Sequence, residues 1–356
     1  MKWVISFVFI PLLWSPSLLH GQEMERFLSN QQIIKMMEKS PTSYEVKSLR
    51  DLDGIPPDKL RKEIFPDLNQ LIEYPLIEED DSSLSVSSFE FDSLALSVLM
   101  EGEEYYQSGN YQKALSYYEK AIQISEKFYI AYLNAGDCHL MQGNLSQALQ
   151  YYEKAHEINP YDYRTSFFQG TVYLRNGDYS NAKKCYIKAL SLKPRHQNLM
   201  FLLKSKEKEL GIRVNSRRFE PIAVVRKEGD GVAIYVDEDR EPFWISYAFA
   251  KSIWIGEKDY RSRISASNDS GWNSRAEKQA ILSMLETYMI MIEEDPKNRN
   301  EYCELILKIA NDGYLDEFIL YEIASQMNPN IVLSVPGKYK DRIREYVERY
   351  VITDLN

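Results

Sequence analysis

The 356-residue sequence has few of the residues on which most enzyme chemistry depends. It contains only three cysteines and four histidines. An odd, small number of cysteines excludes a fold built on a disulfide framework. His20 lies at the end of the first apolar run, and the other histidines lie at positions 139, 156 and 196. A histidine-based catalytic triad, a Cys-His pair or a histidine-bearing zinc site is therefore excluded for the chain beyond residue 196.

Motifs that hold cofactors or metals are also missing. The sequence has no glycine-rich phosphate loop before a helix and no cysteine pair at metal-binding spacing, so we expect neither a cofactor nor a metal site. Residues 51–54 resemble the start of a calcium loop, but Lys62 stands where that loop needs a glutamate. The net charge of −10 argues against a nucleic-acid partner, because such binding requires dense lysine and arginine.

Long apolar runs are confined to two places. Residues 3–19 are apolar, follow Lys2 and precede the small residue Gly21, which is typical of a secretory signal peptide. We therefore expect residues 1–21 to direct export to the periplasm, the cell envelope or the medium, with an uncleaved anchor or a buried segment as alternatives. Residues 243–255 are apolar on all sides but too few to cross a bilayer, which predicts a central buried helix with membrane-surface attachment as the alternative.

The strongest internal pattern is a repeat with a period of 34 residues. Residues 101–114, 135–148 and 169–182 align without a gap. Two glycines recur in each unit: Gly102, Gly136 and Gly170, then Gly109, Gly143 and Gly177. The first glycine of each unit lets a partner helix approach closely, and the second supplies the positive φ that ends a helix and turns the chain. Each unit is therefore predicted to be a pair of antiparallel helices.

Small and aromatic residues recur on the second helix of each unit. Tyr118, Tyr152 and Tyr186 lie between alanines spaced seven residues apart, so the rings are expected to fill the space that the alanines leave. Pro160 and Pro194 end the second and third of these helices. This 34-residue pattern resembles the tetratricopeptide repeat.

The resemblance implies a mainly α fold. Residues 95–196 would form a solenoid of three helical hairpins, and residues 197–211 would form a capping helix ended by Gly211. The first repeat departs from the family pattern at Glu101, where an apolar residue is usual, and at Glu126, where the others have proline.

In proteins similar to this one, the first helices line a concave surface that binds a peptide or a partner helix. The equivalent positions here are Leu99, Glu103, Tyr106, Leu133, Asn134, Asp137, Leu140, Met141, Arg164, Phe167, Thr171 and Arg175. Members that grip a chaperone's carboxyl terminus carry Lys, Arg and Asn here, and Asn134 is the one clear counterpart. A concave surface with apolar residues at its centre and acidic and basic residues at its borders favours binding of an amphipathic or aromatic peptide. Alternatively, the leucines face neighbouring helices and complete the core.

The remaining regions resemble no family. Residues 22–94 are predicted to be a Pro-rich, acidic and Ser-rich segment that ends in a linker. Residues 213–356 are predicted to be a smaller α+β domain. It would contain a hairpin of residues 222–226 and 232–236 and helices at 275–294, 301–311, 314–327 and 338–351. The helix at 314–327 could be a degenerate repeat.

These observations favour an exported scaffold or adaptor that binds another protein or peptide and has no enzymatic activity. Its oligomeric state is not predicted. In the alternative hypothesis, the repeats are structural support, and residues 213–356 bind a small molecule or polymer or hydrolyse it with carboxylates. Asp237, Glu238 and Asp239 are the candidates for that chemistry.

Overall fold

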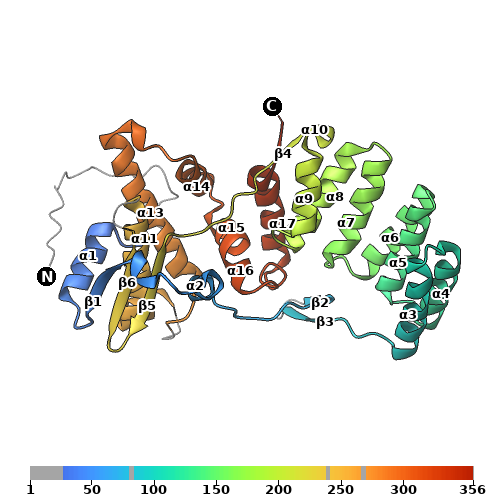
Figure 1. Cartoon of the computed structure of the whole chain (residues 1–356), viewed down its shortest axis with the longest axis horizontal. Helices are drawn as coiled ribbons and strands as arrows, with labels where there is room; N and C mark the ends of the chain where they lie inside the picture. Colours follow the sequence, from blue (N-terminus) through green and yellow to red (C-terminus); the bar gives the residue numbers. More distant parts are fainter. Residues whose placement is uncertain (1–26, 80–83, 238–240, 266–269, 356) are drawn as a thin grey trace. The chain divides into compact units, whose positions relative to one another are not determined.

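The computed structural model describes residues 27–79, 84–237, 241–265 and 270–355 (Figure 1). The predicted signal peptide, residues 1–21, lies outside these ranges. The chain divides into two compact units. We call Gly54–Pro221 with Asp316–Asn356 the repeat unit, and the described part of Met1–Asp53 with Ile222–Leu315 the sheet unit.

The repeat unit contains three helical hairpins in succession, as the 34-residue period predicts (Figure 1). The helices are α3 (Ser93–Gln107), α4 (Tyr111–Ile124), α5 (Tyr129–Met141), α6 (Leu145–Ile158), α7 (Tyr163–Arg175) and α8 (Tyr179–Leu192). The hairpin turns have positive φ at Gly109, Gly143 and Gly177, at 78°, 80° and 76°. The prediction of a helical-hairpin solenoid of the tetratricopeptide type is confirmed.

The glycines and tyrosines of the repeats form the predicted close contacts. Tyr118, Tyr152 and Tyr186 are fully buried. A Cβ atom at Gly136 would lie 2.4 Å from the ring of Tyr152, and one at Gly102 would lie 2.8 Å from Tyr118. Any larger residue at these glycines would push the two helices of a hairpin apart.

The cap of the solenoid follows the third hairpin. It consists of α9 (Gln197–Ser205) and α10 (Glu207–Leu210), and Gly211 ends it in the left-handed conformation. The predicted single helix is thus divided at Lys206. Leu199, Leu203 and Leu210 are buried, whereas the side chain of Phe201 is 77 % exposed.

The end of the chain packs on the repeats and not with the rest of the predicted 213–356 domain. From Asp316 it contains most of α15 (Leu315–Phe318), the π-helix η5 (Ile319–Ala324), α16 (Ser325–Met327), α17 (Gly337–Tyr346), the π-helix η6 (Val347–Val351) and β7 (Ile352–Asp354). Strand β7 pairs with β4 (Ile212–Val214), and α17 and η6 contact α8. The boundary therefore differs from the prediction, because α17 and η6 pack against α8 of the third repeat.

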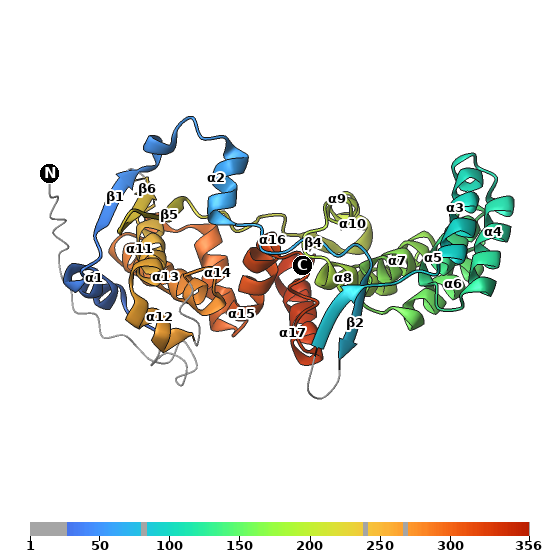
Figure 2. The same cartoon turned by 90° about the horizontal axis from the view of Figure 1, so that it is seen from below.

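Residues 54–92 are more ordered than the predicted linker. They form α2 (Pro57–Ile64) and an antiparallel pair of strands, β2 (Pro75–Glu79) and β3 (Leu84–Ser88). The ring centroid of Phe89 lies 5.1 Å from that of Tyr129, and Phe91 lies 5.2 Å from Phe128. This segment is fixed to the repeats by aromatic side chains, which the proline and serine content of the sequence obscures. Figure 2 shows the order of its elements, from α2 through β2 and β3 to α3.

The sheet unit packs helices against a three-stranded sheet of order β1-β6-β5. The predicted hairpin is present as β5 (Ala223–Glu228) and β6 (Gly231–Val236), and β1 (Tyr44–Ser48) joins β6 in parallel. The helices are α1 (Asn30–Lys39), α11 (Phe243–Gly256), α12 (Lys258–Ile264), α13 (Ser274–Glu294) and α14 (Glu301–Asn311), with short 3₁₀ turns η3 (Leu49–Leu52) and η4 (Pro296–Asn298).

Helix α11 occupies the centre of the sheet unit, as its apolar sequence predicts. It contacts β5, β6 and α13, and eight of its residues are buried. Among the helices of the described ranges, none is both long enough and apolar enough to cross a membrane.

Candidate functional site

The first helices of the repeats, α3, α5 and α7, present equivalent residues along one face. Positions separated by three or four residues lie on the same side of a helix. We call the resulting set of residues the repeat face: Leu96, Met100, Glu103, Gln107, Ile130, Asn134, Asp137, Met141, Arg164, Phe168, Thr171 and Arg175. Polar contacts join neighbouring helices there, since Asn134 Nδ2 donates to Glu103 Oε1 at 2.6 Å and Arg175 donates to the carbonyl of Leu140 at 3.1 Å.

Each of the two carboxylates of the repeat face accepts a hydrogen bond from a tyrosine on the second helix of its own hairpin. Tyr118 donates its hydroxyl hydrogen to Glu103 at 2.8 Å, and Tyr152 donates to Asp137. Burial, together with the charge of Glu103, raises the pKa of Asp137 to about 6, although the Tyr152 hydrogen bond and Arg175 act in the opposite direction. The third repeat has Thr171 at this position, so the negative charge is confined to the first two repeats.

Burial separates the predicted groove residues into three groups. Leu99, Leu133 and Leu140 are 4 %, 2 % and 6 % exposed, so these leucines belong to the core and not to an open surface. Met141 is 48 % exposed and Arg175 is also exposed. The other members, Glu103, Tyr106, Asn134, Asp137, Arg164, Phe167 and Thr171, are half-buried.

Arg164 does not serve as an open cation of the groove. Its guanidinium pairs with the buried carboxylate of Asp162, donates to the carbonyl of Glu73 at 2.9 Å and lies 4.4 Å from the ring centroid of Tyr74. The side chain therefore attaches residues 73–74 to the start of α7. Asn159 reinforces this attachment, because its Nδ2 donates to the carbonyl of Pro75 at 2.8 Å.

The amino-terminal segment thus contacts the starts of α5 and α7. Its aromatic contacts are at Phe128 and Tyr129, and its polar contacts are at Arg164, in the first turn of α7, and at Asn159, which follows the end of α6. Met141 and Arg175, at the opposite ends of these helices, remain exposed. The segment accordingly leaves that part of the repeat face open.

Several exposed apolar residues were not among the predicted site residues, and Leu96, Met100 and Phe201 are the ones that repeat spacing relates to the site. Leu96 and Met100, on α3, are 37 % and 58 % exposed, and Phe201 is 77 % exposed. The sequence contains the pattern that would have identified them. Leu96 and Met100 precede Glu103 at helical spacing, and Phe201 follows Phe167 by one 34-residue period.

The carboxylates considered for catalysis form no described site. Asp237 follows β6, whereas Glu238 and Asp239 lie outside the described residues. Within the ranges that the structure describes, no group of three or more His, Cys, Asp or Glu side chains could hold a metal ion.

Comparison with protein families identifies the repeats directly. Two tetratricopeptide-repeat profiles match, one over residues 99–163 and the other over residues 163–196. These 34-residue hairpins are therefore tetratricopeptide repeats. A search of curated proteins found no match.

Solved structures of tetratricopeptide-repeat domains are similar to part of the chain. The first such domain of Spaghetti (RPAP3), bound to an HSP90 peptide, is 20 % identical, covers 35 % of this chain and 98 % of its own, and has a TM-score of 0.32. The Arabidopsis OM64 domain is 24 % identical and covers 33 % and 93 %, with a TM-score of 0.30. The TPR2B domain of yeast Sti1, in complex with an Hsp70 peptide, is 18 % identical and covers 33 % and 91 %, with a TM-score of 0.28.

Proposed function

We propose that this protein is an exported adaptor that binds an amphipathic peptide segment of another protein on the repeat face. The observation that carries the proposal is the exposure of Met100 and Met141, at 58 % and 48 %, on the same face as Glu103 and Asp137. Solenoids of this class use such extended surfaces for binding. Methionine side chains adapt to apolar partners of differing shape, which suits a peptide-binding surface.

The charges of the face define the partner's chemistry further. Glu103 and Asp137 lie on the first two repeats, and Arg175 lies on the third. A segment with apolar side chains on one side, a basic residue near the first two repeats and an acidic residue near the third would match both the surface and the charges.

The proposal that the protein is exported rests on the signal-like pattern of residues 1–21. Mass spectrometry of the mature amino terminus from the native host would test it.

Selection from a displayed library of random peptides tests the binding proposal. The full chain serves as bait, and the affinities of the selected peptides are measured by fluorescence polarisation. We expect apolar peptides with the charge order given above, and Met141→Glu and Met100→Glu each to weaken binding by about tenfold or more. Leu133 is unsuitable for this test, because glutamate at a side chain that is 2 % exposed would disrupt the core.

Ile124→Glu is the matched control. This residue is 40 % exposed at the end of α4, a second helix of a hairpin, and does not belong to the repeat face. Equal losses in the control and in the methionine variants would reject the repeat face as the binding surface, as would a library that yields no binding peptide.

A further inference from the structure

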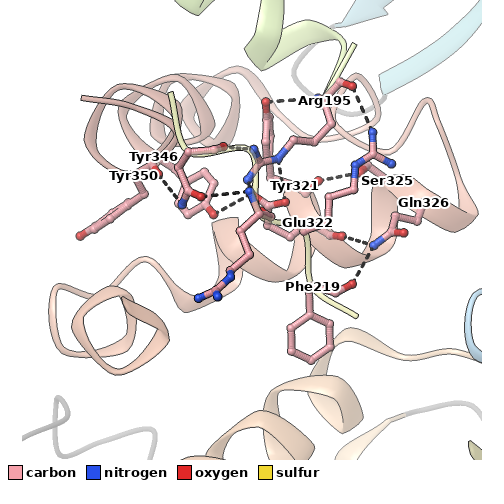
Figure 3. A network of polar contacts seen from close by, with 11 residues as sticks. Arg195, Phe219, Tyr321, Glu322, Ser325, Gln326, Tyr346 and Tyr350 are labelled. Carbon is pink, nitrogen blue, oxygen red and sulfur yellow. Dashed lines mark hydrogen bonds and ion pairs between the residues drawn. The ribbon is translucent and has the colours of Figure 1, made fainter. Parts of the chain in front are cut away.

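A second candidate site lies after the third repeat. There Arg195, in the loop after α8, binds residues near the end of the chain. Arg195 Nε and one terminal nitrogen donate to Glu322 of η5 at 2.9 and 2.6 Å (Figure 3). The two side chains are 7 % and 2 % exposed. Tyr346 donates its hydroxyl hydrogen to the same carboxylate at 3.0 Å. The charges of Arg195 and Glu322 therefore neutralise each other inside the protein.

The backbone around this ion pair is unusual. Arg195 has φ of 53°, and among the described residues it is the one non-glycine residue with positive φ. Glu322 lies in the π-helix η5, and Tyr346 immediately precedes the π-helix η6. Positive φ at a large side chain and π-helical turns both cost conformational energy, and both are concentrated at functional sites.

A cavity of about 170 Å³ adjoins the ion pair. Its lining residues are Arg61, Pro194, Arg195, Arg218, Glu322, Ser325 and Gln326. Because pockets for drug-sized ligands span about 300–1,000 Å³, this cavity is suited to a small ion or a single chemical group. Its lining carries three arginines and one carboxylate, so it is strongly positive.

Two of these arginines have no acidic partner among the described residues. One guanidinium nitrogen of Arg218 donates to the carbonyl of Arg195 at 3.3 Å, and Arg61 donates to the side-chain oxygen of Gln326. Both bonds go to neutral oxygens, and most of the N–H groups of Arg218 remain available. Guanidinium groups present paired donors that fit the oxygens of a phosphate group.

We propose that this cavity binds a phosphate group. Since Arg195 and Glu322 cancel, Arg61 and Arg218 leave two positive charges, which match the charge of about −1.5 to −2 on a phosphate at neutral pH. Arg61 and Arg218 supply the donors to the phosphate oxygens, and the Arg195–Glu322 ion pair forms part of the cavity lining. This site is independent of the repeat face and of peptide binding there.

Isothermal titration calorimetry of the full chain tests the proposal with two probes, inorganic phosphate and O-phosphoserine, against chloride at equal ionic strength. We expect saturable binding of at least one probe. Arg218→Gln and Arg61→Gln should each weaken binding by about tenfold or more, because each removes a charge-assisted hydrogen bond. Tighter binding of phosphoserine would assign the group to a modified side chain, and tighter binding of phosphate would assign it to the free ion.

Arg217→Gln is the matched control, because its exposed side chain is adjacent in sequence but does not line the cavity. The control variant is expected to bind phosphate as the unmodified protein does. The proposal is overturned if neither probe binds beyond chloride, or if Arg217→Gln weakens binding as much as Arg218→Gln. Arg61 is exposed, so its variant retains the fold and keeps the test decisive.

Discussion

At the scale of single residues, the repeats depend on a glycine and a tyrosine that meet across each hairpin. Both residues recur at intervals of 34 in the sequence, and for this reason their contact could be predicted without the structure. The exposure of the leucines could not be predicted. Leu133 and Met141 both lie on α5, and the core-facing and open sides of that helix are distinguished only by the neighbouring helices that cover Leu133.

The Gly136→Ala variant tests this contact. The added methyl group would lie 2.4 Å from the Tyr152 ring, so we expect the free energy of unfolding to fall by about 1–3 kcal/mol in urea titrations. Gly337→Ala is the control, since its methyl group would meet nothing closer than 3.9 Å. Equal stabilities of Gly136→Ala and the unmodified protein would show that the hairpin does not require the close approach.

Two other residues of the repeats give the stability opposite dependences on pH. Burial raises the pKa of Asp137 from 3.8 to about 6. The contribution of Asp137 to the free energy of unfolding is therefore greatest in acid and is lost as the pH rises through 6. Burial and the charge of Lys188 lower the pKa of His156 from 6.5 to about 4. Its contribution is therefore present above pH 6.5 and falls as the pH decreases toward 4.

We expect single substitutions to reveal each dependence. Each variant is compared with the unmodified protein, so that the other titrating groups cancel. On acidification from pH 6.5 to 4, Asp137→Asn should lose more stability than the unmodified protein, because it lacks the group that is favoured in acid. His156→Gln should lose less than the unmodified protein, because it lacks a group that opposes folding in acid. Urea unfolding of the three proteins at both pH values measures these differences, and a difference of the opposite sign for either variant would contradict the pKa shift assigned to that residue.

At the scale of elements, the ion pair of Arg195 and Glu322 joins the loop after α8 to η5. An uncompensated buried charge is costly, so Arg195→Met should lower the free energy of unfolding by about 3–5 kcal/mol. The double variant Arg195→Met/Glu322→Leu should recover much of that loss, because neither charge then remains buried. A single variant as stable as the unmodified protein would show that the pair does not hold these elements together.

Most helices of the chain could be predicted, because each has apolar periodicity bounded by Gly, Pro or a capping residue. Helix α14 spans Glu301–Asn311 as predicted, and the turn after it has Gly313 at φ of 78°, as in the repeats. The parallel pairing of β1 with β6 could not be predicted, since it joins Tyr44–Ser48 to Val232–Val236 across most of the chain. The attachment of residues 73–91 depends on aromatic contacts that have no sequence period.

At the scale of the whole molecule, the two units are interleaved along the chain. The predicted domain of residues 213–356 contains Ile222–Leu315 of the sheet unit and Asp316–Asn356 of the repeat unit. Local sequence patterns carry no information on which distant segments share a core, so the boundary was predicted where the repeat pattern ends.

A fragment of residues 213–356 should therefore fail to fold cooperatively. It lacks strand β1 and the third repeat, against which α17 packs. We expect a broad thermal transition by circular dichroism and exposed apolar surface, whereas the full chain should unfold cooperatively under the same conditions. A sharp thermal transition and amides protected from hydrogen exchange in the fragment would show that residues 213–356 fold as one domain, as the sequence predicts.

The central claim is that the repeat face binds a peptide segment. Nuclear magnetic resonance of the full chain with labelled methionine methyl groups tests it most directly, by titration with a peptide selected from the library. The account predicts saturable shifts of Met100 and Met141, which are exposed on the face, and none at Met284, which is buried in the sheet unit. Binding that shifts Met284 and leaves Met100 and Met141 unchanged would contradict it.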